Sequence, residues 1–302
     1  MSSQHLVITG ATGHIGSQLV HALLAQGHRV TAVARPSKRL DALGQAGATV
    51  AAGNLLDTAF LTQVLHGADA AFLMIPPNGK AADVLADMRQ GGEALAQAMQ
   101  AAGLQQAVSL SSARVDQPVG NGPLFVAQEA RLNAIAGLAV AHLRPAFFMD
   151  NLLSNIGMIQ RLGGVASTMR PDVSLPMVAT RDIAAKAAEL LGGPLTGPSV
   201  HYLLGPRKYS MQEVTVAFGQ AIGQPQLPYH QLGYDQARQG MLKAGLSASM
   251  ADLMEEMIRT QNEGRVVERN MRTAASTTPT TIEAFAQTVF APAFQRAQQL
   301  AS

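Results

Sequence analysis

Apolar and polar positions alternate on two different scales along the first half of the chain. Short runs that are apolar throughout are separated by longer segments in which apolar residues recur every three or four positions, as on one face of a helix. Strands that are apolar throughout are typical of a parallel sheet covered by helices on both faces. The predicted strands are 5–9, 29–34, 49–51, 68–75, 106–110 and 139–143, and the predicted helices are 17–26, 58–66, 81–102 and 124–136.

The first predicted strand runs through three spaced glycines straight into the first predicted helix. Gly10 allows a tight turn, Gly13 lets backbone N–H groups approach a pyrophosphate, and Gly16 lets the helix pack closely on the strand. The helix N-terminus adds N–H donors and the positive end of a dipole. An ordinary glycine-rich turn is the alternative, but this context favours a dinucleotide site. The sequence predicts an α/β Rossmann-type, doubly wound parallel sheet, with cofactor contacts from Gly10, Thr12, Gly13, His14, Ile15 and Gly16.

A basic loop follows the second predicted strand, and it contains Arg35 and Lys38. Folds that select NAD place an acidic residue near this point, where it binds the ribose 2′-hydroxyl. This chain has no acidic residue there until Asp41. A guanidinium can bind a 2′-phosphate through two parallel hydrogen bonds, whereas a carboxylate would repel it. We therefore predict NADP(H) as the cofactor, bound at its 2′-phosphate by Arg35 with help from Lys38 or Arg39.

Further contacts are expected where the other strands end. Ligands of parallel sheets bind beyond the carboxyl ends of the strands. The cofactor contacts predicted on this basis are Asn54, Leu55, Met74, Ile75, Pro76 and Ser111.

The pattern loosens after about residue 150. A helix begins near Thr180, residues 200–204 form a returning strand, and Ser210 with Glu213 forms a capping box. One further strand is predicted at 226–230. We expect residues 1–150 to form the cofactor domain, rejoined by about 178–206. Residues 151–177 and 207–302 would form a smaller, mostly helical lobe that closes over the binding crevice.

Composition narrows the function classes. The net charge is +2 with 14% charged residues, and no basic run extends beyond the loop at 35–39, which argues against nucleic acid as a partner. The chain has no Cys, and its eight His show no metal-ligand spacing, so no disulfide and no metal site are expected. No leader peptide and no apolar run long enough for a membrane span is recognisable. A cytoplasmic monomer or homodimer is the expectation.

Several segments together resemble the NmrA-like family, an atypical branch of the short-chain dehydrogenases and reductases. They are the glycine turn, the loop at Arg35, residues 143–151, residues 179–184 and the tail at 278–285. The resemblance is strongest to NADPH-dependent quinone and dye reductases. It implies that the segment after Arg144 lines the nicotinamide end, which adds Pro145 and Phe147 to the cofactor contacts. The predicted contacts with a small aromatic substrate are Phe147, Phe148, Asn151, Met177 and Met241.

Each of these substrate contacts has a simpler structural alternative. The Phe residues fit a core equally well, and Asn151 fits a helix cap. Met250, Met254 and Met257 have the spacing of a buried helix face, so packing is favoured for them over a mobile lid. His142, in an apolar strand, is interpreted as a core histidine with satisfied hydrogen bonds rather than as an acid.

The helix at 124–136 contains neither Tyr nor Lys, and the four tyrosines lie between 202 and 234. Typical short-chain dehydrogenases use a Tyr–Lys pair on this helix to transfer a proton. Quinones and dye cations do not need such a proton donor. Hydride addition to a quinone gives a stabilised anion that water can protonate, and addition to a dye cation needs no proton. The sequence therefore favours a flavin-free NADPH-dependent reductase of quinone-like, azo or other dye-like acceptors, with no catalytic residue assigned.

Two alternatives remain open. One is a non-catalytic NADP(H)-sensing regulator, which the missing Tyr and Lys suit equally well. The other is a reductase of a biosynthetic intermediate such as a phenylpropanoid. The resemblance to plant relatives implies a Lys on the helix at 124–136 for that activity, and its absence counts against it.

Overall fold

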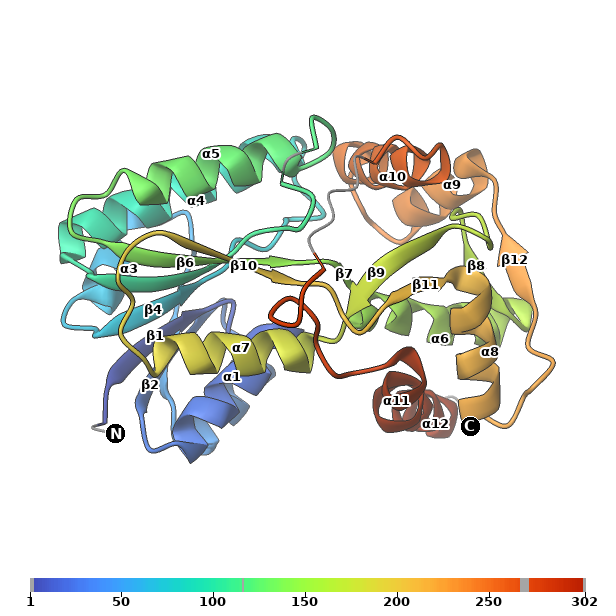
Figure 1. Cartoon of the computed structure of the whole chain (residues 1–302), viewed down its shortest axis with the longest axis horizontal. Coiled ribbons are helices and arrows are strands. Elements are labelled where there is room, and N and C mark those ends of the chain that lie inside the picture. The colour runs from blue at the N-terminus through green and yellow to red at the C-terminus, as the bar shows by residue number, and fades with distance from the viewer. Residues whose placement is uncertain (1–2, 116, 267–271, 301–302) are drawn as a thin grey trace. The chain divides into compact units, whose positions relative to one another are not determined.

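A computed structural model describes residues 3–115, 117–266 and 272–300, and these form two compact units (Figure 1). The first unit takes residues up to 116, then 121–145 and 180–202. The second takes 117–120, 146–179 and the chain from 203 onward. The chain therefore passes between the units several times.

The first unit is built on a seven-stranded sheet with the order β10-β6-β5-β4-β1-β2-β3. Strands β1 to β6 pair in parallel, and β1 lies between β2 and β4. The predicted α/β doubly wound fold is confirmed. The strands are β1 His5–Thr9, β2 Arg29–Ala34, β3 Thr49–Ala52, β4 Ala70–Leu73, β5 Gln106–Leu110, β6 Ala139–Pro145 and β10 Ser199–Leu203.

Helices cover both faces of this sheet. Helix α1 packs on α7, α3 packs on α4, and α4 packs on α5. Figure 1 shows α4 and α5 on one side of the sheet and α1 and α7 on the other. The helices are α1 His14–Ala25, α2 Lys38–Gln45, α3 Thr58–Leu65, α4 Val84–Ala102, α5 Gly122–Asn133 and α7 Thr180–Leu191.

Local side-chain chemistry sets the helix boundaries. Helix α4 begins at Val84, later than the predicted 81, because the Asp83 carboxylate accepts a hydrogen bond from the Ala86 N–H at 2.9 Å. The same helix ends at Gly103, whose φ of 67° is left-handed. Helix α5 runs over 122–133 instead of 124–136. Helix α1 begins at His14, so the glycine turn leads into it without a spacer.

The second unit combines helices with two small sheets, β11-β9-β7 and β12-β8. The predicted strand at 226–230 is displaced to 229–231, and the neighbouring short strands were not predicted. Its strands are β7 Phe147–Phe148, β8 Val165–Ser167, β9 Ser174–Val178, β11 Lys208–Ser210 and β12 Tyr229–Gln231. Its helices are the 3₁₀ segment Met149–Ser154, α6 Asn155–Leu162, α8 Met211–Ala221, α9 Tyr234–Lys243, α10 Ala248–Asn262, α11 Ile282–Phe285, the π segment Ala286–Phe290 and α12 Ala291–Gln299.

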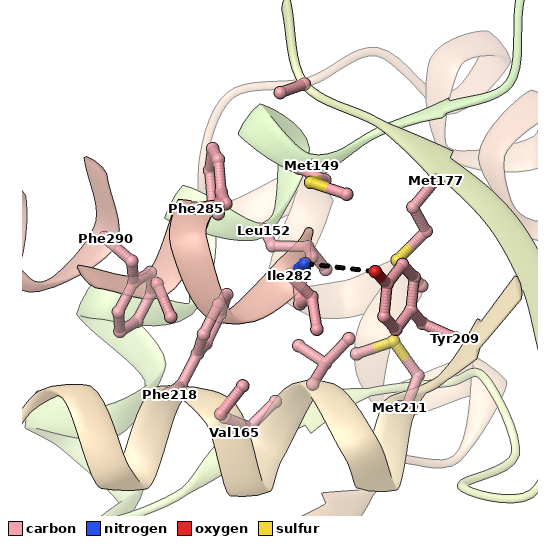
Figure 2. Close-up of a cluster of buried hydrophobic side chains, with 14 of the residues drawn as sticks. Met149, Leu152, Val165, Met177, Tyr209, Met211, Phe218, Ile282, Phe285 and Phe290 are labelled. Carbon is pink, nitrogen blue, oxygen red and sulfur yellow. Dashed lines mark hydrogen bonds between the residues drawn. The ribbon is translucent and has the colours of Figure 1, made fainter. Parts of the chain in front are cut away.

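An aromatic cluster forms the core of the second unit (Figure 2). The rings of Phe218 and Phe290 stack with their centroids 3.7 Å apart. The Ile282 N–H donates a hydrogen bond to the hydroxyl of Tyr209 at 3.3 Å. The predicted capping box of Ser210 and Glu213 is present and starts helix α8 beside this cluster. The tail of the chain is thereby fixed to α8 and β11.

No helix in the described parts of the chain combines the length and apolar character needed to cross a membrane.

Candidate nucleotide-binding site

The glycine turn after β1 has the close backbone contacts that the sequence predicts. Gly10 has a φ of 63°, a conformation that favours glycine. The Gly13 N–H donates to the Gly10 carbonyl at 3.0 Å. A Cβ on Gly16 would overlap that carbonyl oxygen and would lie 2.8 Å from the Cα of Ala11. The turn therefore needs glycine at 10 for conformation and at 16 for space.

Helix α1 begins directly after this turn, and no side chain caps its N-terminus. Its N-cap residue is Gly13, whereas Ser37, Asp57 and Asp83 cap the helices α2, α3 and α4. An uncapped helix start leaves N–H donors available to an anion. Ile15 is only 3% exposed, so its predicted contact with a cofactor has to come from its backbone.

The side chain of Met74 lies against the glycine turn. Its terminal methyl group occupies the place where a Cβ on Gly10 would lie. Its backbone is fixed, because the Met74 N–H donates to Thr9 Oγ1 at 2.8 Å. Met74 therefore contacts the turn directly, which is consistent with its place among the predicted cofactor residues.

The loop after β2 presents exposed positive charge. Arg35, Lys38 and Arg39 are exposed, and in the described part of the chain none of them has an ion-pair partner. Ser37 caps α2 by accepting from the Leu40 N–H at 3.3 Å, so Lys38 stands in the first turn of that helix. Cations are unfavourable at a helix N-terminus unless an anion neutralises them. This loop is suited to an anionic ligand.

The loops after β3 and β4 hold four more of the predicted contacts. Asn54 is exposed, and its side-chain oxygen accepts from the Leu56 N–H at 3.1 Å, which fixes the loop. Leu55 and Ile75 are half-buried and pack on the apolar cluster beneath α3 and α4. Pro76 is exposed.

A buried polar network at the ends of β5 and β6 was not predicted. The carboxylate of Glu129, on α5, accepts from the Ser111 hydroxyl at 2.5 Å. It also accepts from Arg144 Nε at 3.0 Å and Nη2 at 2.5 Å. Arg144 Nη1 donates to the Tyr202 hydroxyl at 2.6 Å. The network joins β5, β6, β10 and α5 through their side chains.

The hydrogen bonds of this network favour the ionised form of Glu129. Burial alone would raise the pKa of the Glu129 carboxyl, but the bonds from Arg144 and Ser111 outweigh burial and hold this pKa below its ordinary value. Burial lowers the pKa of His142 despite the nearby Glu129 charge. His142 is 1% exposed, and its Nε2 lies 2.8 Å from Asn133 Oδ1. His142 is thus the predicted core histidine, but only half of its hydrogen-bonding capacity is satisfied, because its buried Nδ1 has no partner among the described residues.

The network changes the interpretation of Ser111. Its single hydroxyl proton is donated to Glu129 and the residue is 5% exposed, so Ser111 cannot also donate to a ligand in this arrangement. The adjacent Ser112 is half-buried, and its oxygen accepts from the Arg114 N–H at 3.1 Å. Helix α5 contains neither Tyr nor Lys, and it carries Phe125 and Glu129. Pro145 is buried at the end of β6.

The predicted substrate residues all lie in the second unit, in different surroundings. Phe147 and Phe148 are half-buried in β7, Asn151 is exposed and Met241 is half-buried on α9. Met177 has no exposed surface and belongs to the aromatic cluster, so its position favours packing over ligand contact.

Two of the simpler alternatives also need correction. Asn151 lies within the 3₁₀ segment whose N-cap is Phe148, so it does not cap a helix. The trio of Met250, Met254 and Met257 is half-buried, while the fully buried face of α10 is formed by Ala251, Leu253, Thr260 and Asn262.

Known proteins resemble this chain along most of its length. A curated NAD(P)H azoreductase from Xenophilus azovorans is 29% identical over 254 residues, which is 83% of this chain and 85% of that protein. An NADPH-dependent quinone oxidoreductase from Escherichia coli, solved with NADPH, has a TM-score of 0.77 at 20% identity and covers 94% of this chain and 99% of its own. A triphenylmethane reductase from Citrobacter has a TM-score of 0.80 at 14% identity over 95% and 99%. The two structures share the fold.

The model of the NmrA-like family matches residues 2–286, which include the glycine turn, the loop at Arg35 and the Glu129–Arg144 pair. The chain belongs to the NmrA-like family.

Proposed function

We propose that the protein is an NADPH-dependent reductase of quinone-like, azo or other dye-like aromatic acceptors that works without flavin. The observation that carries this proposal is the tight glycine turn before an uncapped helix α1, with an unpaired basic loop after the next strand. The similarity to an azoreductase supports the acceptor class.

The residues of the first unit fit NADPH. Backbone N–H groups of the turn 10–16 would bind the pyrophosphate, since Gly16 holds the helix start against the turn. Arg35 and Lys38 would bind the 2′-phosphate. The adenosine contacts would come from Asn54, Leu55, Met74, Ile75 and Pro76. NADPH, when bound, supplies the hydride.

The acceptor class follows from the groups that this chain lacks. The Glu129 carboxylate accepts a hydrogen bond from the Ser111 hydroxyl, and α5 contains neither Tyr nor Lys. Ser111 and the ionised Glu129 are therefore not set to protonate an alkoxide as it forms. A quinone or a dye cation accepts hydride into a delocalised system and does not need such a group. Simple ketones and sugars are disfavoured for the same reason.

A non-catalytic NADP(H) sensor is the second candidate. The same observation favours it, because a Ser111 hydroxyl that donates to Glu129 suits a protein that binds the cofactor without turning it over. It requires tight NADPH binding and no reaction with any acceptor.

The test is NADPH oxidation at 340 nm by flavin-free protein with a panel of quinones, azo dyes and triarylmethane dyes, with NADH in parallel. Acceptor-dependent oxidation that prefers NADPH is expected. NADPH binding without turnover across the panel would replace the reductase with the sensor. Absence of NADPH binding would overturn both.

A further inference from the structure

A small, partly open cavity in the first unit is lined by residues of β4 and β5 and of helices α4 and α5. Its volume is about 60 Å³. Of the predicted cofactor contacts, Ile75 alone lines it. Its walls are mainly apolar and include Leu73, Leu95, Leu110 and Phe125. It is a separate feature that the proposed reductase function does not use.

Two buried polar side chains line this cavity with uncommitted donors. Ser109 is 4% exposed, and its hydroxyl has no hydrogen-bond partner in the described chain. Gln128 is 9% exposed; its Oε1 accepts from Arg131 Nη1 at 2.7 Å, while its Nε2 has no acceptor among the described residues. Neither Ser109 Oγ nor Gln128 Nε2 is among the fully buried unpartnered atoms of the described chain, so both donors reach the open space of the cavity. A ligand in that space that carries hydrogen-bond acceptors would pair with them. The lining therefore favours a ligand that brings hydrogen-bond acceptors.

Helix α4 is shaped to admit Gln128. A Cβ on Gly92 would overlap the Gln128 side-chain oxygen, and a Cβ on Gly91 would lie 3.2 Å from Ile75. Glycine inside a helix is unfavourable for helix stability, and here the two glycines give room to the neighbouring side chains. Its effect is to let the amide of Gln128 lie at the cavity wall.

The charged residues of the lining favour an anion. Arg89 is exposed and has no ion-pair partner among the described residues. Arg131 is paired with Glu93 at 3.3 Å. Two guanidinium groups facing one carboxylate leave an excess of positive charge at this lining. An anionic acceptor with two oxygens matches the two donors and the charge.

We propose that this cavity binds a short monocarboxylate of about the size of propionate. Its carboxylate oxygens accept hydrogen bonds from Ser109 Oγ and Gln128 Nε2, and its hydrocarbon end packs on the apolar walls. The size limit comes from the volume, since a cavity that holds benzene measures roughly 150 Å³. A ligand that contains a six-membered ring is therefore too large for this cavity.

The experiment is a titration of the full chain, without NADPH, with sodium propionate at constant ionic strength, followed by ligand-observed NMR. One saturable site is expected. The variants Gln128→Leu and Ser109→Val should each weaken binding by about tenfold or more, as expected when a hydrogen bond to a charged group is lost. The matched control Gln97→Leu changes an exposed glutamine of α4 and should bind propionate normally. Benzoate should not compete.

Several results would overturn the proposal. They are the absence of saturable binding, an unchanged affinity in Gln128→Leu, equal competition by chloride, and a crystal structure grown with propionate that shows water alone in the cavity. Thermal unfolding of each variant establishes that it is folded, and Gln128→Leu carries the test if Ser109→Val is not. NADPH affinity, measured on the same samples, reports on the proposed function separately, because the carboxylate site does not depend on it.

Discussion

Arg144 and Glu129 form a two-point ion pair between β6 and α5, with Nε on one carboxylate oxygen at 3.0 Å and Nη2 on the other at 2.5 Å. The side chains are 16% and 9% exposed, so both charges are largely removed from water. Such a pair stabilises little against an apolar alternative, but breaking it leaves an isolated buried charge.

Glu129→Ala should therefore lower the free energy of unfolding by about 3–5 kcal/mol, because Arg144 loses its partner while remaining buried. Urea denaturation measures this. The control is Glu93→Ala, which removes the exposed partner of Arg131 and should cost about 0–1 kcal/mol. Equal effects of the two substitutions would show that the buried pair has no special role.

Stability should fall on acidification in two stages. Burial lowers the pKa of His142 in the folded chain, and unfolding restores it to about 6.5, so the unfolded state binds more protons below that pH. Glu129, whose folded pKa is also lowered, contributes stability at neutral pH that is lost as the pH falls below the ordinary glutamate range.

His142→Gln should reduce the pH dependence of unfolding between pH 7 and pH 5, measured as denaturation midpoints across that range. His66→Gln changes an exposed histidine and serves as the control. An unchanged slope in His142→Gln would mean that another group titrates there.

Arg35→Ala should weaken NADPH binding by about 1–3 kcal/mol, through the loss of a charge-assisted contact with the 2′-phosphate. NADH, which lacks that phosphate, should bind as before. Arg29→Ala removes an exposed arginine at the other end of β2 and should leave both affinities unchanged. Isothermal titration gives the dissociation constants, and equal losses for both cofactors would contradict the assignment.

Gly16→Ala should abolish NADPH binding and destabilise the fold by about 1–3 kcal/mol, because its Cβ overlaps the Gly10 carbonyl. Gly240→Ala, in α9, adds a Cβ in open space and should be neutral or slightly stabilising. Thermal unfolding with and without NADPH measures both effects. A Gly16→Ala protein that binds NADPH normally would contradict the close approach.

The sequence predicted elements best where a local signal was strong. Strands β1, β2 and β5 have the predicted bounds, since each is a short, mainly apolar run followed by a glycine or a polar residue. The short strands of the second unit were missed because runs of two or three residues, such as β7, show no periodicity.

Side-chain partners distant in sequence were harder to predict. Ser111 and Glu129 lie 18 positions apart, and nothing local to either one indicates the other. An acidic residue on an otherwise poorly charged α5 was the available signal, because a carboxylate facing a buried strand needs a partner. Met177 illustrates the opposite error, since a strand residue near a predicted crevice proved to be fully buried.

The close contact between Gly16 and Gly10 belongs to the glycine turn, which is a different part of the proposed cofactor site from the loop at Arg35. The proposed phosphate site is backbone held at a fixed spacing, so a side chain at Gly16 would disturb the packing of α1. Arg35 stands outside that packing on an exposed loop. With the proposed role of Arg35, coenzyme preference can be redesigned at position 35 without altering the packing beneath the turn.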